Sequence, residues 1–213
     1  MTAAELTLAE RVWLMIAAPD TGRPRPGCGG IAVTAAGLLD LIDEGAVELE
    51  DAEVLCTERA PSNALLREPW QRLADAGGGG ELGLVHALNG IHPRWEAVEL
   101  ALRKQGLTAG VIHRLRRDEI TVTDEGRVLR QQIVRRCRAG LHDAESFDRD
   151  SRSLLMLLWA ADVEETGLSE SLYLTDHSVL PQVASMFDDD RRAEALAHAV
   201  TVATNLAALR GIT

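Results

Sequence analysis

Apolar residues recur with helical spacing along most of the chain, separated by short polar or glycine-rich breaks. Thr7 and Glu10 are spaced as a capping box, which predicts a helix that starts at residue 8 and ends before Pro19. The run VWLMIA inside it is apolar on every side, so we expect this helix to be buried. The same periodicity predicts further helices at about residues 35–44, 63–76, 82–89, 93–105, 125–139, 149–163, 168–173, 177–187 and 190–209.

Two short β-hairpins are predicted between these helices. Residues 46–56 (AVELEDAEVLC) alternate apolar and acidic positions around an acidic turn, and the β-capable runs 111–115 and 120–123 flank a second turn. Each hairpin follows a helix that a glycine ends, Gly45 in one case and Gly106 in the other. The predicted fold class is mainly α, a single globular helical domain with short β-hairpins. Within the helix at 149–163 we expect deep burial of Leu154, Leu155, Leu157, Leu158 and Trp159.

The composition fits one globular domain over residues 1–213, since 46% of the residues are apolar and 26% are charged. No run of about 18 apolar residues is present, so no membrane-spanning helix is predicted. Acidic residues near the start argue against a signal peptide. Cys28, Cys56 and Cys137 are odd in number and lack CxxC spacing, which predicts a reduced, cytoplasmic protein without a disulfide framework.

Positive charge is concentrated in one part of this acidic chain. The formal net charge is −11, yet residues 103–138 hold ten of the 22 Lys+Arg and four acids, so they carry 10 − 4 = +6 and the remainder 12 − 29 = −17. Such a basic side attracts phosphate groups at short range, because screening removes the distant negative field beyond roughly 8–10 Å. The alternative is an ordinary solvated helix face. The helix predicted at 125–139 has an apolar face with Leu129, Ile133, Cys137 and Leu141, and a second face with Arg127, Gln131, Arg135 and Arg138.

Motifs of catalysis and of metal or cofactor binding are not found. The tetraglycine Gly77–Gly80 lacks the GK[ST] of a phosphate-binding loop. The six histidines form no HExxH motif and do not pair with cysteines at zinc spacing. Asp176-His177-Ser178 holds the letters of a catalytic triad, but adjacency in sequence does not orient the three side chains for catalysis. We therefore predict that the chain is not an enzyme and uses no metal or cofactor.

Five segments follow one another in an order that carries a family resemblance. They are LTLAERVWLMIAAPDTG, LLDLIDEGAVELED, APSNALLREPWQRL, RWEAVELALRKQGL and FDRDSRSLLMLLWAADV, with a hairpin and a basic helix before the last. Over nearly the whole chain this order resembles the Golgi phosphoprotein 3-like family, and the composition is similar to that of a bacterial member. The resemblance implies a mainly α-helical peripheral membrane protein, since eukaryotic members bind phosphatidylinositol-4-phosphate and hold glycosyltransferases in the Golgi. It also implies self-association through the hairpin at 110–123.

The resemblance also indicates where a lipid head group would bind. The family places a Trp and an Arg around the start of the second helix, where this chain has Arg25 and Thr34. Its two further arginines correspond to His92 and Trp95, with Arg94 between them, so none of the four residue types is kept in place. The resemblance thus implies a head-group site that comprises Arg25, His92, Arg94 and Trp95. The basic surface predicted from the charge pattern comprises Arg114, Arg116, Arg117, Arg127, Arg135 and Arg138.

Three functions are compatible with this pattern. The first is a peripheral membrane protein that binds an anionic phospholipid or a phosphoinositide, and that acts as an adaptor for a protein client. The second is a winged-helix DNA-binding regulator, because residues 93–138 predict a helix, a wing with arginines and a further helix; its helix EAVELALRK offers few base-reading residues, which disfavours nucleic acid. The third is an interaction scaffold that binds no ligand.

Overall fold

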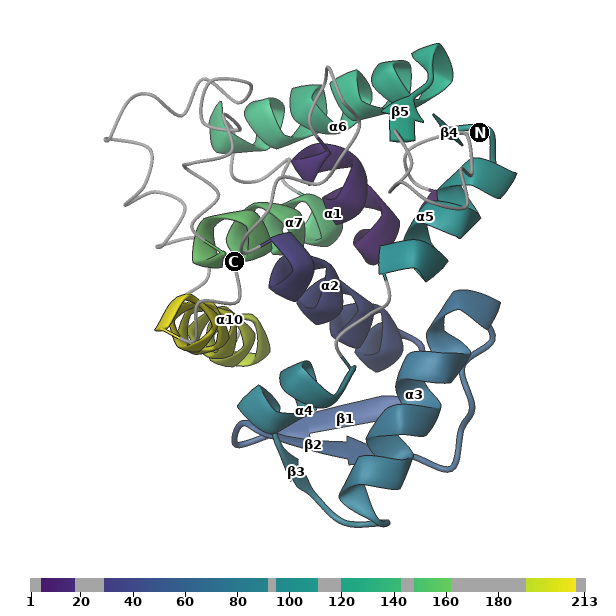
Figure 1. Ribbon diagram of the computed structural model, residues 1–213. Coiled ribbons are helices and arrows are strands. Elements are labelled where there is room, and N and C mark those ends of the chain that lie inside the picture. The colour runs from purple at the N-terminus through teal and green to yellow at the C-terminus, as the bar shows by residue number, and fades with distance from the viewer. Residues whose placement is uncertain are drawn as a thin grey trace.

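The first helix lies at the centre of the computed structural model, which describes residues 5–17, 29–91, 95–110, 120–142, 148–161 and 191–209 (Figure 1). Helix α1 (Leu8–Ile16) packs against four later helices, and all its residues are buried. The hydroxyl of Thr7 accepts the backbone N–H of Glu10, and the Glu10 carboxylate accepts that of Thr7 at 2.9 Å. The predicted capping box and the buried helix that it starts are confirmed.

Helix α2 (Gly29–Asp43) packs along α1 and begins six residues before its predicted start at residue 35. The prediction was wrong because Ala32 and Val33 are buried in the core, and their burial outweighs the weak helix propensity of the glycines beside them. Gly45 ends this part of the chain as predicted. Its φ of +69° lies in the left-handed region, which glycine adopts without a steric penalty.

The first predicted hairpin is confirmed. Strands β1 (Val47–Glu50) and β2 (Glu53–Cys56) pair antiparallel, and Asp51 and Ala52 both have positive φ values, 46° and 64°, as a tight two-residue turn requires. A third strand, β3 (Leu82–Gly83), pairs with β2 and was not predicted, since a strand of two residues has no alternation of its own.

Two helices lie beside this sheet in the lower part of Figure 1. Helix α3 (Ala64–Gly77) matches the prediction and starts at Asn63, whose side chain accepts the N–H of Leu65 at 2.9 Å. Helix α4 (Leu84–Ile91) starts two residues later than predicted, because residues 82 and 83 form β3.

The second hairpin connects the next two helices. Helix α5 (Trp95–Lys104) ends before Gly106, whose φ is +77°. Strands β4 (Thr108–Gly110) and β5 (Ile120–Val122) pair antiparallel and lead into α6 (Asp124–His142), so the predicted hairpin and the predicted basic helix are both confirmed. The pairing begins three residues before the predicted run 111–115, which lies outside the described residues.

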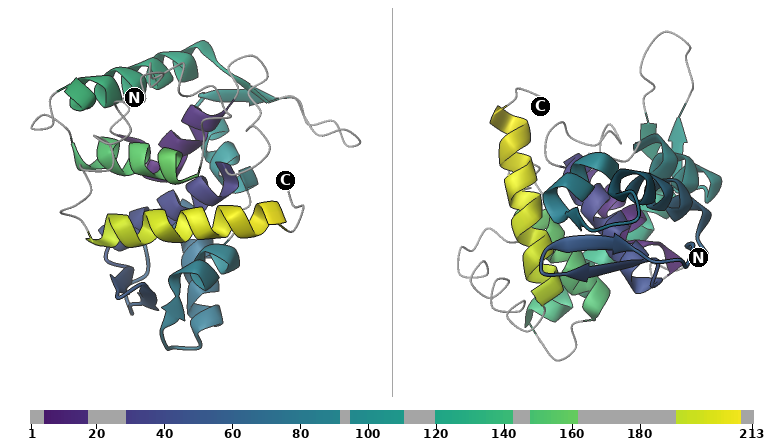
Figure 2. Two further views of the ribbon diagram at one scale, coloured as in Figure 1. Left: turned by 90° about the vertical axis from the view of Figure 1, so that its left-hand side faces the viewer. Right: turned by 90° about the horizontal axis from the view of Figure 1, so that it is seen from below.

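The remaining described helices are α7 (Arg149–Ala160) and α10 (Arg191–Leu209). Figure 2 shows α10 running along one side of the molecule, where it contacts α2, α4 and α7. The leucines of α7 are buried as predicted, but the prediction for Trp159 was wrong, since 46% of its surface is exposed. Trp159 lies on the side of α7 that its neighbours leave uncovered, and a continuous apolar run gives no signal of which side that is.

The fold class predicted from sequence is confirmed, because helices dominate the described chain and the strands form only short antiparallel hairpins. The helices predicted at 168–173 and 177–187 lie outside the described residues. Cys56 and Cys137 are free thiols, and Cys28 is outside the described part of the chain. The assignment of residues 1–213 to one domain stays a prediction.

Candidate functional site

Helix α6 is fixed at its N-terminus by Thr123. The Thr123 hydroxyl accepts the N–H of Gly126 at 3.1 Å and donates to the carbonyl of Gly106 at 2.8 Å, while its backbone N–H donates to the carbonyl of Leu107 at 3.0 Å. Gly126 approaches Leu107 so closely that a Cβ atom at Gly126 would lie 2.3 Å from the carbonyl oxygen. The start of α6 is therefore held tightly against the base of the second hairpin.

One face of α6 is apolar and faces the protein, as the four-residue spacing predicted. Leu129, Ile133 and Cys137 are buried, and the helix packs against α1 and α7. The side chain of Leu141, the next residue of this stripe, is outside the described set. Burial raises the pKa of the Cys137 thiol to about 12, so this sulfur stays protonated and acts as a packing atom.

Another face of α6 lines an open groove with a volume of about 510 Å³. We call it the α6 groove, and its residues are Val122, Arg127, Arg130, Gln131, Val134, Arg135 and Arg138. All but Val122 come from α6 and recur every three or four residues, so they form one stripe over three helical turns. Four guanidinium groups therefore lie along a single hollow on a protein whose formal net charge is −11.

The arginines of the α6 groove differ in how they are held. Arg127 pairs with Asp124 at 3.0 Å, but both side chains are mostly exposed. Arg130 donates to the carbonyl of Ala17 at 2.7 Å, just beyond the C-terminal end of α1. Arg135 is exposed, and no described carboxylate lies within ion-pair distance of it. The positive charge at Arg135 is thus the one most available to a ligand within the described part of the groove.

The sequence is similar to one known protein family over most of its length. The model of the family described as Golgi phosphoprotein 3 (GPP34) matches residues 8–205. The chain belongs to the Golgi phosphoprotein 3 family. No curated protein matches the sequence. Within the residues described for this family member, no helix is both long enough and apolar enough to span a lipid bilayer.

The predicted head-group site of this Golgi phosphoprotein 3 family member is only partly visible. Arg25, His92 and Arg94 lie outside the described residues, and Trp95 is described only by its backbone, at the start of α5. Whether these residues form a site stays a prediction. Three residues of the predicted basic surface, Arg114, Arg116 and Arg117, also fall outside the described chain.

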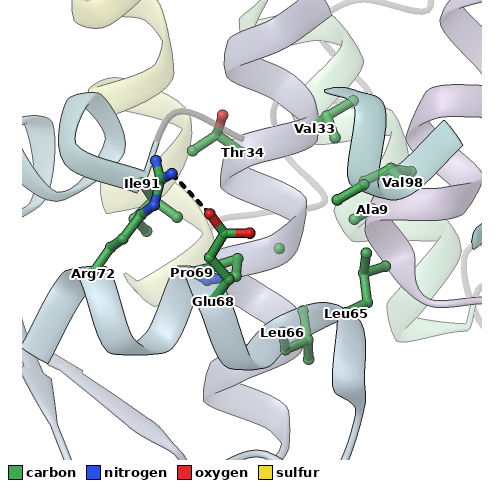
Figure 3. Close-up of a pocket in the computed structure, with 12 residues that line it drawn as sticks. Ala9, Val33, Thr34, Leu65, Leu66, Glu68, Pro69, Arg72, Ile91 and Val98 are labelled. Atoms are coloured by element: carbon green, nitrogen blue, oxygen red, sulfur yellow. Dashed lines mark hydrogen bonds and ion pairs between the residues drawn. The ribbon is translucent and has the colours of Figure 1, made fainter. Parts of the chain in front are cut away.

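Thr34 lines a small pocket of about 40 Å³ between α1, α2, α3, α4 and α5 (Figure 3). We call it the apolar pocket, because most of its lining is aliphatic, including Val33, Leu66, Ile91 and Val98. The Thr34 hydroxyl donates to the carbonyl of Gly30 at 2.8 Å, so its donor is already used inside α2. The charged groups of the lining are Glu68 and Arg72, which pair with each other at 2.8 Å.

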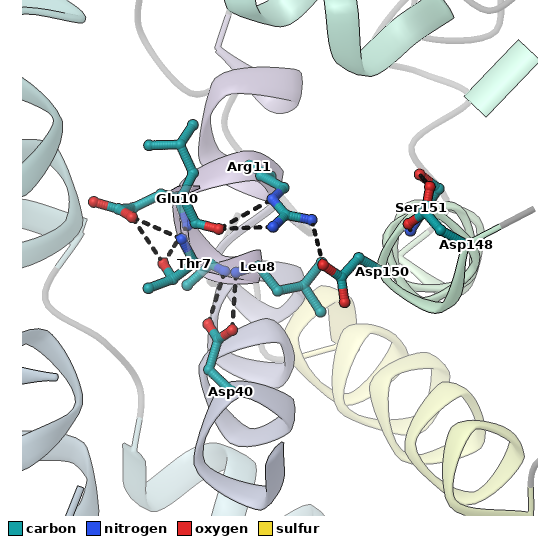
Figure 4. A network of polar contacts seen from close by, with 10 residues as sticks. Thr7, Leu8, Glu10, Arg11, Asp40, Asp148, Asp150 and Ser151 are labelled. Carbon is teal, nitrogen blue, oxygen red and sulfur yellow. Dashed lines mark hydrogen bonds and ion pairs between the residues drawn. The ribbon is translucent and has the colours of Figure 1, made fainter. Parts of the chain in front are cut away.

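A polar network joins α1 to α2 and α7 (Figure 4). The Asp40 carboxylate accepts the first two backbone N–H groups of α1 at 2.9 and 3.0 Å, so a residue of α2 caps α1. Arg11 donates to the carbonyl of Leu6 and to Asp150 of α7 at 2.8 Å. Burial raises the pKa of Asp40 to about 7, although the hydrogen bonds from Ala9 and Leu8 lower it. This network stabilises the helix packing and does not open onto the α6 groove.

Arg127, Gln131, Arg135 and Arg138, which the sequence placed on one helix face, line the same groove, whereas Arg130, Val122 and Val134 were not among the predicted residues. Arg130 and Val134 follow from the same helical stripe and could have been found by extending it. Val122 could not, because it lines the groove only through the packing of β5 on α6. Among the described residues no cluster of three or more His, Cys, Asp or Glu is placed to hold a metal ion.

Proposed function

We propose that this member of the Golgi phosphoprotein 3 family is a non-enzymatic peripheral membrane protein that binds anionic lipid head groups through the α6 side of the molecule. The observation that carries the proposal is the α6 groove, where four arginines from one helical stripe line a single hollow on an acidic protein. Phosphatidylinositol-4-phosphate, or a lipid similar to it, is the head group that the family resemblance suggests. An adaptor role for a protein client belongs to the same proposal.

Electrostatics supports reversible binding of this kind. A basic residue close to an anionic membrane surface contributes about 1 kcal/mol, and the effect falls off within one Debye length of roughly 8–10 Å. Four arginines in the groove would therefore supply about 4 kcal/mol before the ordering of the protein on the surface is subtracted. Such binding is weak alone and sensitive to salt, which fits a protein that attaches to a membrane and leaves it again.

Two further contributions stay predictions of the same proposal. Arg114, Arg116 and Arg117 belong to the chain that joins β4 to β5, and β5 leads directly into α6, so we expect them to add to the basic side. Arg25, His92, Arg94 and Trp95 form the second expected head-group site. Self-association through the 110–123 hairpin would raise the avidity of either site by placing two copies on one surface.

Vesicle co-sedimentation tests the proposal with variants that leave the core unchanged. Arg135→Glu replaces an exposed positive charge in the groove, and Arg67→Glu makes the same change on an exposed position of α3 outside it. A reversal of two charge units should cost about 2 kcal/mol, or roughly 30-fold in partitioning onto vesicles that contain phosphatidylserine. Vesicles of phosphatidylcholine alone should retain neither variant nor the parent protein.

Other outcomes distinguish the alternative functions. If Arg135→Glu sediments with anionic vesicles as well as Arg67→Glu does, α6 is not the contact surface. If the parent protein ignores anionic vesicles but shifts duplex DNA in a salt-dependent manner, the winged-helix interpretation replaces the membrane proposal. Absence of both kinds of binding would leave the interaction scaffold.

A further inference from the structure

We propose that the α6 groove is a docking site for a second copy of this chain, which presents the outer face of its β1–β2–β3 sheet to the arginines. The contact is head-to-tail, because the groove and the sheet lie at opposite ends of the molecule (Figure 1). It requires no membrane, and it differs from the self-association expected through residues 110–123. Where the proposed function also holds, a second copy and a lipid surface compete for the same arginines.

The outer face of the sheet is acidic because its strands alternate. Glu48 and Glu50 are exposed on β1, and the residues next to them on this strand are buried. Glu50 pairs with Glu53 of β2, so the side chains of both lie on the same side of the sheet. Residues 46–56 hold four acids and no lysine or arginine. We call this surface the acidic sheet face, and its residues are Glu48, Glu50, Glu53 and Leu55.

The negative charge of the acidic sheet face is not balanced within the described chain. The ion pairs of the described residues do not include Glu48, Glu50 or Glu53. Glu53 lies beside Glu81, and the hydrogen bond between the two carboxyl groups, together with the repulsion of Glu81, raises the pKa of Glu53. A guanidinium group from outside would relieve this repulsion, because it places a positive charge beside carboxylates that the fold leaves side by side.

The α6 groove offers positive charges with a repeat similar to that of a strand. Residues four apart on a helix are separated by about 6 Å along its axis, and alternate residues of a strand by about 6.6 Å. A strand laid along the groove therefore brings Glu48 and Glu50 to successive side chains of the arginine stripe. Arg135 is exposed and has no ion-pair partner among the described residues, and the amide of Gln131 offers a donor one helical turn away.

Both surfaces also carry an apolar side chain among their charged groups. Leu55 pairs with Glu48 and is half-buried on the acidic sheet face, and Val134 is half-buried in the groove. Contact between these two apolar side chains would exclude water from the neighbouring ion pairs, and a lower local dielectric strengthens the attraction between opposite charges. The groove is open and about 510 Å³ in volume, so it has room for the side chains of a short strand.

The placement of the two surfaces makes a second copy the occupant, because every copy carries both of them. Helix α6 lies at the top of Figure 1 and the sheet at the bottom, with α1 and α2 between them, so one molecule cannot bring its sheet to its own groove. Two antiparallel copies side by side can form both contacts, whereas copies in a row leave one groove and one sheet open at the ends. Each copy carries a formal net charge of −11, so the attraction acts only within roughly 8–10 Å, and the docking is weak and reversible.

An exchange of the charges of the two surfaces tests the docking. The groove variant carries Arg127→Glu and Arg135→Glu, the sheet variant carries Glu48→Arg and Glu50→Arg, and sedimentation velocity measures the self-association of each over a wide range of protein concentration. Each variant alone should associate about tenfold or more weakly than the parent protein, because like charges then face each other. An equal mixture of the two variants should recover the association of the parent, since the negative groove of one meets the positive sheet of the other.

The matched control carries Glu58→Arg and Asp75→Arg. Both residues are exposed and lie outside the acidic sheet face, Glu58 after β2 and Asp75 on α3. The control changes the net charge by the same amount as the sheet variant, but it should not restore association when it is mixed with the groove variant. Circular dichroism of every variant establishes that the fold is intact, as expected for exposed residues.

A second arm measures the competition with a membrane. With phosphatidylserine vesicles in excess, the retained fraction of the parent protein should fall as its concentration is raised, because second copies then occupy the grooves. The retained fraction of the sheet variant should stay constant over the same range, since its copies do not dock on one another. A retained fraction of the parent that rises instead would show that the grooves stay open in the associated protein, and it would contradict docking at α6.

Three further results would overturn the inference. The parent protein could stay monomeric at every concentration, or it could associate without being weakened by either pair of substitutions, and in both cases the groove is not where copies meet. If each variant associates weakly but their mixture does not recover, the groove and the sheet do not contact each other. Recovery in the mixture without retention of the parent on anionic vesicles would instead support the docking and contradict the membrane proposal.

Discussion

The α6 groove and the apolar pocket differ in what lines them and in how far water reaches them. The groove is open, about 510 Å³ in volume, and carries four arginines, whereas the pocket is about 40 Å³ and is lined mostly by aliphatic side chains of five helices. The two charged groups of the pocket, Glu68 and Arg72, pair with each other, whereas the groove is lined by four arginines of α6. The pocket is therefore part of the packing between helices, whereas the groove is part of the charged surface.

The difference shows where charged residues can be exchanged at little cost in stability and where they cannot. Helices α1 and α2 are buried against each other, so a charge between them would be desolvated and must be paired or neutral. The groove face of α6 lies in water, where arginines replace other polar residues at little cost in stability. The aliphatic core thus limits which residues the pocket can hold, while the exposed face of α6 tolerates the exchange of polar residues.

A carboxylate introduced into each hollow should give the largest contrast. Val33→Asp places an unpaired charge in the apolar pocket, where Val33 is 1% exposed, and should lower the free energy of unfolding by about 3–5 kcal/mol. Val134→Asp makes the same change beside the arginines of the groove and should cost about 1 kcal/mol or less. Urea denaturation of both variants measures the difference. Equal losses of unfolding free energy would show that water reaches a carboxylate equally well in the two hollows.

Asp40, a buried carboxyl group of α2, should make the free energy of unfolding depend on pH. The pKa of this carboxyl is about 7 in the folded protein against an ordinary 3.8, so the folded state retains a proton that the unfolded chain releases. The free energy of unfolding should therefore fall by up to about 1.4 kcal/mol for each pH unit between about 4 and 7.

The Asp40→Asn variant tests this slope, since its side chain does not titrate. The difference in unfolding free energy between the parent protein and Asp40→Asn should change steadily across this range, in denaturation curves recorded at several pH values. Arg135→Gln in the groove removes no carboxyl group and should keep the slope of the parent. A constant difference between parent and Asp40→Asn would contradict the raised pKa.

Substitutions at two glycines should give a smaller difference in stability, which depends on the room around each Cα atom. Gly126 abuts Leu107, so Gly126→Ala forces the start of α6 to shift and should cost about 1–3 kcal/mol. Gly37 is helical and lines the apolar pocket, and a methyl group on its Cα would meet no atom within 4 Å, so Gly37→Ala should stabilise the protein by about 0.5–1 kcal/mol. Thermal denaturation of both variants measures these two changes in stability. Stabilisation by Gly126→Ala would show that the contact with Leu107 is looser than described.

The ion pairs beside the two hollows should have the smallest effects. Arg127–Asp124 at the groove and Arg72–Glu68 at the pocket are both partly or largely exposed pairs within one helix. Arg127→Gln and Arg72→Gln should each change the free energy of unfolding by less than about 0.5 kcal/mol. The two values should converge further in high salt, where screening weakens both pairs. A loss above about 1 kcal/mol at Arg72 would instead indicate that its aliphatic stem is needed for packing.

The helix positions were predictable where local signals agree with packing. The capping box at Thr7 and the stops at Gly45 and Gly106 lie where the sequence placed them. The start of α2 was missed because burial overrides the low helix propensity of Gly29 and Gly30. Strand β3 was missed because its identity comes entirely from pairing with β2.

The candidate site was predictable to the extent that it belongs to a single helix. The four-residue spacing of Arg127, Gln131 and Arg135 predicted a shared face, and the structure places them in one groove. The anchoring of Arg130 by Ala17 could not be predicted, since the two residues are 113 positions apart in sequence. The apolar surroundings of Thr34 depend likewise on how five helices meet.

Thr123 has a consequence for how this protein can vary during evolution. Its hydrogen bonds to the carbonyls of Gly106 and Leu107 hold the two ends of the hairpin together, independently of how many residues lie between them. Lengthening a closed loop costs only about 0.6 kcal/mol for each doubling. Insertions, deletions and exchanged sequences between β4 and β5 should therefore be inherited without disturbing α6, so new binding partners can be acquired there while the helical body stays the same.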